Sequence, residues 1–301
     1  MNPEFGSRNA MTSVAEYTQL YEELGEKYPE TEHAHNEKFP GSRYWTVMKE
    51  LHPYSSRSKR LIDIGCNDGV FTIPYCLRGG TALGIDISDS LIRKASGSAR
   101  HFSNRCKFLR REVDSSHIDS EFKNSFDVAL FSEVLEHLLN PDQALRNIQT
   151  MLVSGGDLIL TTPTPLFDNP SLSFKYIYDL ISGRRLVENH ELDTDKLSKF
   201  QISSFAYRHD GYYPIALMKY VESFGFACKK YYTIDYLRTI EKSVLTDDLQ
   251  RQLNFLSEQQ TFRTRFLKKV RQFGLELEIP LRRFPIMNLF GSTNIAIFEK
   301  I

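Results

Sequence analysis

The stretch LIDIGCNDGVFT, residues 61–72, decides the fold class of this chain. An apolar run leads into Asp63, glycines follow at Gly65 and Gly69, and an apolar helical pattern begins directly after them. A buried strand, a glycine-containing turn and a helix start in this order are typical of the loops that hold nucleotide-like cofactors in α/β proteins. The stretch therefore predicts a cofactor loop and leaves open which cofactor it holds.

The remainder of the chain repeats the alternation of strand and helix. Strand-like runs occupy residues 60–65, 81–88, 106–113, 126–132 and 156–163, with further β-rich runs at 228–237 and 292–300. Helical patterns separate the first five runs at residues 70–78, 89–102, 133–139 and 141–153. Because the runs are apolar and alternate with helices, they predict an α/β fold with a doubly wound, mostly parallel sheet.

Two segments interrupt this alternation and are expected to act as lids. Residues 164–207 follow the fifth strand, and residues 238–291 separate the last two. Open α/β sheets bind ligands at the carboxyl ends of their strands, where these segments are expected to leave. The expected order begins with a vector-derived leader (1–10), an N-terminal helical lid (11–59) and the cofactor-binding core (60–163). A substrate-lid insertion (164–207), a continuation of the core (208–237), a helical insertion (238–291) and a final strand (292–301) follow.

The composition narrows the class of protein. Lys and Arg number 38 and Asp and Glu also number 38, so no global charge favours nucleic acid or an anionic membrane as partner. No run of 18 apolar residues is present, so no transmembrane helix is expected. The cysteines form no C-x-x-C pair and fit reduced thiols, which predicts a cytoplasmic protein. They are Cys66, Cys76, Cys106 and Cys228.

The glycine loop does not match a dinucleotide site. The fingerprint G-x-G-x-x-G brings the backbone close to a pyrophosphate at a helix start. Its three positions are occupied here by Gly65, Asn67 and Val70, so two of the three glycines are missing. Asn67 is an acceptable substitute in the turn itself, because asparagine tolerates a left-handed backbone better than most residues do.

Several motifs in order resemble those of the class I S-adenosylmethionine-dependent methyltransferases. IDIGCNDG resembles their first motif, [DE]-x-G-x-G-x-G with its middle glycine replaced, LGIDIS resembles the second, and REVDSS the third. FDVALFSEVLEHLLNPDQALRNIQTMLVSGGDLILTTPTP resembles the stretch through strands four and five in the UbiE/UbiG-like and methyltransferase-23-like groups. The resemblance covers residues 60–163 and a later element, YRHDGYYPIALMKYVESFGF, at 207–226.

This resemblance implies a Rossmann-like seven-stranded sheet with an antiparallel final strand, helical lid insertions, and S-adenosylmethionine as cofactor with S-adenosylhomocysteine as product. It implies that Asp86 binds both ribose hydroxyls, that Asp114 lies near the adenine amino group, and that Asp63 orients the amino-acid part. Cys66 is interpreted as a small buried thiol that fills the turn. The expected cofactor-binding residues are Asp63, Gly65, Cys66, Asn67, Gly69, Asp86, Ile87, Val113, Asp114, Ser132 and Glu133.

Two histidines are the candidate catalytic residues. His137, in EVLEH, and His209, in YRHDGYY, could act as general bases toward a substrate hydroxyl, since imidazole titrates near neutral pH. In small-RNA 2′-O-methyltransferases an E-x-x-E-H pattern with a later histidine binds a divalent metal. Glu133, Glu136 and His137, placed on one helical turn, could do so here with His209. A purely structural histidine is the third possibility, and the expectation is no metal.

Two flanking segments carry weaker signals. The aromatic N-terminal block is expected to lie over the cofactor, with Tyr17, Tyr21 and Tyr44 as candidate ligand contacts and His33 and His35 not a metal pair. Residues 261–285 form a basic amphipathic pattern with one apolar helical face and cations elsewhere. That face is expected to pack on the core, and peripheral membrane contact is the alternative. It consists of Phe262, Phe266, Val270 and Phe273.

The leading functional prediction is O-methylation of a hydroxyl on a small-molecule acceptor, such as a sugar or a secondary or lipid-like metabolite. One rival is an RNA 2′-O- or tRNA methyltransferase, although the zero net charge disfavours a nucleic-acid partner. Another rival is a non-catalytic cofactor-binding partner module. The RNA rival would need a basic groove built from Arg184, Arg185, Lys268, Lys269, Arg282 and Arg283. The atom methylated and the oligomeric state are not predictable from this sequence.

Overall fold

A computed structural model describes residues 40–57, 59–116, 120–164, 212, 214–235, 269, 273, 276, 278–280 and 291–301. Its strands are β1 (Arg60–Ile64), β2 (Thr81–Asp86), β3 (Cys106–Arg110), β4 (Phe126–Ser132), β5 (Leu152–Pro163), β6 (Phe226–Ile234) and β7 (Thr293–Lys300). Its α-helices are α3 (Arg43–Ser55), α4 (Thr72–Leu77), α5 (Asp89–Ser98), α6 (Pro141–Met151) and α9 (Pro214–Glu222). Short 3-10 turns cover Arg100–Phe102, Ser120–Phe122 and Leu135–His137.

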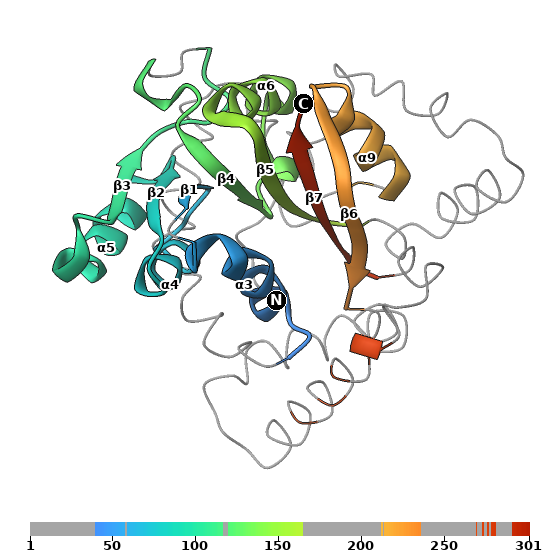
Figure 1. Cartoon of the computed structure of the whole chain (residues 1–301), viewed down its shortest axis with the longest axis horizontal. Coiled ribbons are helices and arrows are strands. Elements are labelled where there is room, and N and C mark those ends of the chain that lie inside the picture. Colours follow the sequence, from blue (N-terminus) through green and yellow to red (C-terminus); the bar gives the residue numbers. More distant parts are fainter. Residues whose placement is uncertain are drawn as a thin grey trace, which may run out of the picture.

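The strands form one sheet in the order β3-β2-β1-β4-β5-β7-β6 (Figure 1). The first five strands are parallel to one another, and β7 is antiparallel to both of its neighbours. This confirms the predicted seven-stranded, mostly parallel sheet with an antiparallel final strand. Since β1 lies between β2 and β4, the strand order reverses at β1, which is where ligands bind in sheets of this kind.

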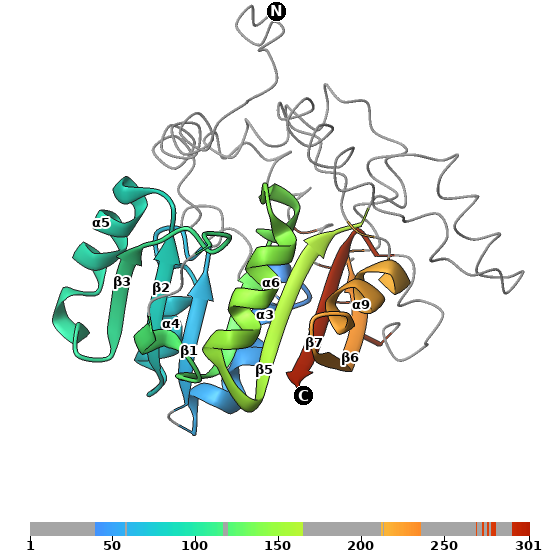
Figure 2. The same cartoon turned by 90° about the horizontal axis from the view of Figure 1, so that it is seen from above.

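Helices cover both faces of the sheet, and consecutive strand residues therefore enter two different cores. Figure 2 shows α6 and α9 on one side, with α3 and α4 on the other. In β4, Val128 and Leu130 pack with the α3 and α4 side, whereas Ala129 and Phe131 pack with the α6 and α9 side. This two-sided burial explains why the central strands are apolar throughout instead of alternating with polar residues.

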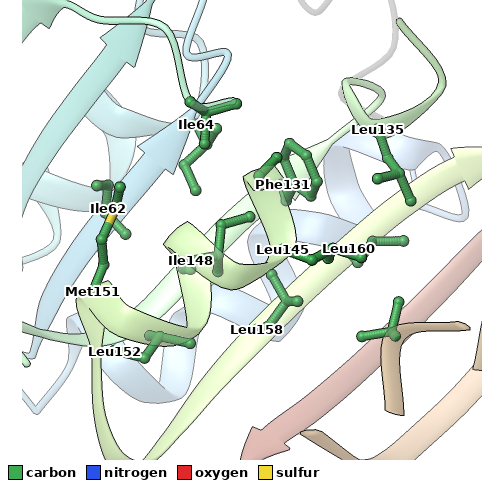
Figure 3. Close-up of a cluster of buried hydrophobic side chains, with 14 of the residues drawn as sticks. Ile62, Ile64, Phe131, Leu135, Leu145, Ile148, Met151, Leu152, Leu158 and Leu160 are labelled. Carbon is green, nitrogen blue, oxygen red and sulfur yellow. The ribbon is translucent and has the colours of Figure 1, made fainter. Parts of the chain in front are cut away.

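The core on the α6 side places the carboxyl end of β4. Figure 3 shows Leu145 and Ile148 of α6 lying against Leu158 and Leu160 of β5, with Phe131 beside them. α6 begins at Pro141, after Asn140 has accepted the amide of Gln143 with its side chain at 3.1 Å. This cap and the proline at the first helical position were both predictable from the sequence.

The boundary between α6 and β5 differs from the predicted one. α6 ends at Met151 instead of residue 153, and β5 starts at Leu152, four residues before the predicted start. Leu152 pairs with Phe126, and the pairing register then shifts before Val128. Gly155 takes a φ of 71° in this irregular stretch, so the two glycines bend the strand instead of preceding it.

The predicted helix 89–102 is also shorter than expected. α5 ends at Ser98, and a separate 3-10 turn covers Arg100–Phe102. β2 in turn ends at Asp86, because Ser88 caps α5 by accepting the amide of Leu91 at 3.3 Å. A residue that caps a helix leaves the extended ladder, so the strand stops there.

The two predicted lid insertions begin at the carboxyl ends of β5 and β6, which lie on either side of the start of β7. The Thr164 amide donates to the Ser292 carbonyl at 2.9 Å, and its hydroxyl donates to the Gly291 carbonyl at 3.0 Å. The Asp235 amide donates to the Glu278 carboxylate at 3.0 Å. Within the part of the chain that the structure describes, no helix is long and apolar enough to cross a bilayer.

Candidate active site

The loop between β1 and α4 is a tight turn built from left-handed residues. Gly65, Asn67 and Gly69 have φ values of 68°, 51° and 88°. The amides of Gly65 and Cys66 both donate to the Ile85 carbonyl, at 2.9 and 3.0 Å. The loop is thereby tied to β2, and Asn67 adopts the conformation for which asparagine is suited.

The two glycines allow neighbouring side chains to approach the loop. A Cβ on Gly65 would lie 2.3 Å from Val134 Cγ2, and one on Gly69 would lie 2.9 Å from Ile73 Cδ1. Both contacts are shorter than packed atoms tolerate, and both backbones are left-handed. Only glycine therefore fits both the backbone angle and the space at these positions.

Asp86, at the carboxyl end of β2, is held by backbone donors. Its Oδ2 accepts the Asn67 amide and its Oδ1 accepts the Ser88 amide, each at 2.9 Å. A carboxylate has about four acceptor positions, and one backbone amide binds to each of its two oxygens. The geometry thus fixes a partly exposed carboxylate at the end of β2. Beside it, the Ile87 carbonyl accepts Arg110 Nε at 3.0 Å.

Behind the loop, Asp63 and Cys66 are buried. The Asp63 carboxylate accepts the hydroxyl of Thr72 in α4. Burial, followed by the charges of Asp63 and Asp86, raises the pKa of the Cys66 thiol well above its usual value. A protonated thiol packed against the Gly84 backbone position fills the turn and is not a nucleophile.

Beyond β3, Val113 is buried and Asp114 is held by the start of α6. Asp114 Oδ2 accepts the Asn140 amide at 3.1 Å, and burial raises the pKa of its carboxyl. The Val113 carbonyl accepts the side-chain amide of Asn147 at 2.6 Å. These bonds fix the segment after β3 against α6, next to the end of β2.

A directed chain of hydrogen bonds crosses the carboxyl ends of β4 and β5. Thr161 Oγ1 donates its only proton to Glu133 Oε1 at 3.0 Å, so at 2.9 Å it must accept from Ser132 Oγ. Ser132 Oγ in turn accepts from Arg43 Nη1 at 3.0 Å. A cation, two hydroxyls and a carboxylate are therefore aligned at the carboxyl ends of β4 and β5, and β4 is the neighbour of β1, where the strand order reverses.

Glu133 is not part of a helical turn, which corrects the expected placement of Glu133, Glu136 and His137 on one turn. Its φ is 55°, and its amide donates to the Thr161 carbonyl at 2.9 Å. The 3-10 turn begins only at Leu135. A non-glycine residue held in this region costs about 1–3 kcal/mol, and such strain concentrates at functional sites.

Arg43 is the site residue that sequence reasoning missed. It opens α3 and reaches Ser132, 89 positions later in the chain. Its guanidinium also lies 5.9 Å from the centroid of the Phe71 ring, on which Tyr44 stacks at 5.5 Å. No local pattern around Arg43 signals this contact, because it depends on how α3 packs across the sheet.

Glu136 and His137 lie next to this chain. Glu136 is 3% exposed and accepts the Thr162 hydroxyl at 3.1 Å. Burial, then the charge of Glu133, raises the pKa of Glu136 well above its usual value, while Thr162 and Arg43 oppose the shift. His137 Nε2 lies 3.8 Å from Glu136 Oε1, with its side chain 21% exposed. An imidazole that reaches solvent beside a buried acid can exchange protons with a bound hydroxyl.

Several predicted residues lie outside the described part of the chain: His209, Tyr17, Tyr21, His33 and His35. Among the described residues no group of three or more metal-ligating side chains is assembled, and His209 is not among them. Phe273 is helical and 62% exposed, so the expectation that the whole Phe262–Phe273 face packs on the core is wrong at that residue. Lys269 is exposed as expected.

Replacing Glu136 by glutamine is expected to flatten the pH dependence of stability. Because the folded-state pKa lies above the ordinary value of 4.5, the native protein binds more protons than the unfolded chain above that pH. The contribution of the Glu136 carboxyl to the free energy of unfolding is therefore lost as pH rises toward its raised pKa. We expect the wild type to lose more unfolding free energy than Glu136→Gln between about pH 5 and pH 8, by denaturant titration.

The exposed Glu121→Gln is the control for this measurement, and it should follow the wild type at each pH. Equal slopes for all three proteins would show that Glu136 titrates like an ordinary surface carboxyl.

Comparison with known proteins adds sequence relatives to this geometry. A family described as a methyltransferase domain matches residues 36–228. The ubiquinone biosynthesis O-methyltransferase of Nitrosomonas europaea is 26% identical over 142 residues, 47% of this chain and 57% of that protein. The corresponding protein of Pseudomonas putida is 25% identical over 186 residues, 56% of this chain and 77% of that protein. The match therefore spans a little over half the length of the first relative.

A solved structure of a candidate sarcosine dimethylglycine methyltransferase from Galdieria sulphuraria superposes with a TM-score of 0.52. The alignment covers 85% of this chain and 86% of that one at 12% identity. At this identity the likeness concerns the fold alone.

Proposed function

The chain belongs to the methyltransferase domain family of class I S-adenosylmethionine-dependent methyltransferases, and from this membership we propose that it methylates a hydroxyl group of a small-molecule acceptor. The hydrogen-bonded chain from Arg43 to Glu133 carries the proposal. It aligns a cation, two hydroxyls and a carboxylate at the carboxyl ends of β4 and β5.

The residues around the loop fit S-adenosylmethionine. The fixed Asp86 carboxylate would accept both ribose hydroxyls. The left-handed backbone at Gly65 and Gly69 would form the tight turn beside the cofactor. Asp114, held at the start of α6, would accept from the adenine amino group. When bound, the cofactor supplies an electrophilic methyl group on a positively charged sulfur. Asp63, Gly65, Cys66, Asn67, Gly69, Ile87, Val113, Ser132 and Glu133 would complete its surroundings.

Arg43 extends this set beyond the sequence prediction. Its guanidinium lies at the carboxyl end of β4, hydrogen-bonded to Ser132. A cation at this point would pair with the carboxylate of the cofactor's amino-acid part. Holding that end and the ribose end together would aim the methyl group at the acceptor, and such positioning supplies much of the rate in a displacement.

The acceptor is proposed to be a hydroxyl on a sugar or a lipid-like metabolite. Two relatives are named ubiquinone biosynthesis O-methyltransferases, which supports oxygen as the methylated atom. His137 would take the hydroxyl proton as the methyl group transfers, with the neighbouring Glu136 orienting the imidazole. His209 remains the second candidate base.

Replacing His137 by alanine is expected to lower kcat by about 10²- to 10⁴-fold, the usual contribution of a general base. The Kd for S-adenosylhomocysteine should stay unchanged, because the imidazole is not assigned to the cofactor. Initial-rate kinetics with titration calorimetry separate the two quantities. The surface variant His101→Ala provides the control. A His137→Ala protein with full kcat would remove His137 from the reaction.

Transfer of a labelled methyl group tests the function itself. The purified protein is incubated with methyl-labelled cofactor and, in turn, phenols, sugars, lipid-like alcohols and transfer RNA. We expect label on an oxygen of one small-molecule class. Label on RNA would favour the nucleic-acid alternative, and tight cofactor binding with no transfer to any class would favour a non-catalytic module.

A further inference from the structure

A strongly basic segment surrounds one edge of the sheet. Residues 93–111, named here the basic edge, contain seven Lys and Arg residues and no Asp or Glu. The chain as a whole has 38 of each charge, so the rest of it carries 31 basic and 38 acidic residues. The positive charge is therefore concentrated here against a negative remainder. The seven cations, all exposed, are Arg93, Lys94, Arg100, Arg105, Lys107, Arg110 and Arg111.

These side chains lie along β3 and the helix beside it. β3 is the terminal strand of the sheet, paired with β2 and with no other described strand (Figure 2). Cys106 and Phe108 face the core shared with α4, so Lys107 and Leu109 project from the opposite face. α5 packs on β3 and adds its own exposed cations. Positive charge thus flanks the strand edge on both faces.

The charges are largely unneutralised within the described part of the chain. Arg93 forms an ion pair with Asp89, one turn earlier in α5. Lys94, Arg105 and Lys107 form no ion pair with any described carboxylate, and neither do Arg100 and Arg110. Arg110 donates to the Ile87 carbonyl and Arg100 to the His101 ring, whereas Lys94, Arg105 and Lys107 remain available to an external partner.

Charged side chains on an exposed edge also prevent pairing between copies of one protein. Two basic edges would repel each other, so that explanation accounts for Lys107 and Arg110 on the strand. It does not account for Lys94 and Arg100, which lie off the strand, or for the absence of any acid in nineteen residues. A surface that repels a second copy of the chain and binds an acidic partner accounts for the cations on the strand and for those beside it.

We propose that the basic edge is a docking site for an acidic peptide segment of a partner protein, which adds to β3 as a further strand. The main-chain groups of β3 would supply the pairing, and the flanking cations would select acidic side chains. Leu109, 37% exposed between the cations, would contact one apolar side chain of the added strand.

Two other polyanions fit the surface less well. Proteins that hold single-stranded nucleic acid stack bases on exposed aromatic rings, and within 93–111 Phe102 is half-buried and Phe108 buried. Membrane-surface elements present an apolar face beside their cations. Leu109 is the one exposed aliphatic side chain of the basic edge, and the cations of the basic edge lie on both faces of the sheet.

The test uses a dye-labelled peptide of alternating glutamate and valine, about ten residues long to match a strand, and fluorescence anisotropy with the full chain. We expect binding that weakens with added salt, and no binding of the same peptide with glutamine for glutamate. Lys94→Glu/Arg105→Glu/Lys107→Glu should weaken binding at least about tenfold.

The control variant, Arg57→Glu/Lys123→Glu/Lys219→Glu, changes the net charge equally at exposed positions elsewhere and should bind as the wild type does. Both variants should bind S-adenosylhomocysteine normally, since none of the six residues contacts the candidate active site. A peptide with alternate N-methylated amides keeps its charge but cannot pair, and should not bind.

Three results would overturn the proposal. They are equal loss of binding in both triple variants, unchanged binding of the N-methylated peptide, and tighter binding of an RNA duplex or of anionic vesicles than of the acidic peptide. The first would show a net-charge effect, the second attraction without strand addition, and the third another class of partner.

Discussion

Asp86→Ala is expected to abolish binding of S-adenosylhomocysteine. The wild-type carboxylate is held by the amides of Asn67 and Ser88 and would receive two ribose hydroxyls. Each hydrogen bond to a charged group contributes about 1.5–3 kcal/mol, so losing two lowers affinity by at least about 100-fold. Titration calorimetry with the purified protein measures the effect directly, with NAD as the ligand that should not bind.

Asp89→Ala is the matched control for this variant. Asp89 lies three positions later, in the first turn of α5, and its carboxylate pairs with Arg93 at the surface. It should bind S-adenosylhomocysteine as the wild type does. Wild-type affinity in Asp86→Ala would refute the ribose assignment, and binding of NAD by the wild type would refute the choice of cofactor.

Gly65→Ala is expected to damage both the fold and the cofactor site. A non-glycine residue in the left-handed region costs about 1–2 kcal/mol. The new Cβ would also lie 2.3 Å from Val134 Cγ2, so the loop or the segment after β4 must move. We expect unfolding free energy to fall by about 2–4 kcal/mol and cofactor affinity to fall at least about tenfold.

Two companion variants separate the causes of that loss. Gly97→Ala, in α5 with nothing within 4 Å of its new Cβ, should stabilise the protein by about 0.5–1 kcal/mol. Gly65→Ala/Val134→Ala relieves the contact but not the backbone strain, and should recover part of the stability in denaturant titrations. No recovery would show that the backbone conformation accounts for the whole effect.

The parts of the site that the sequence predicted are those set by local chemistry. A buried strand, a left-handed turn and a helix follow one another between Asp63 and Thr72. The choice of Asp86 came from the family resemblance. The number of strands in the sheet and the antiparallel β7 followed from the family resemblance. Each of these depends on neighbouring residues or on a shared pattern of elements.

The parts that the sequence did not predict depend on packing between distant segments. Arg43 reaches Ser132 only because α3 packs across the sheet. Glu133 resembles the start of a helix in sequence, but bonds to β5 hold it left-handed. Gly84 in β2 reads as an ordinary strand residue, although a side chain there would meet both Phe108 and Cys66. None of these contacts has a periodicity that a window of sequence could reveal.

The place of β7 has a consequence for synthesis on the ribosome. β7 pairs with β5 on one side and β6 on the other, and Asn294 bonds Pro163 across 131 positions of chain. At a translation rate of about 5–20 residues per second, that interval lasts on the order of ten seconds. During this interval β5 has already been synthesised, but β7, which pairs with its edge in the native sheet, has not. For a nascent chain of this kind, the speed of elongation sets how long β5 is exposed to wrong partners.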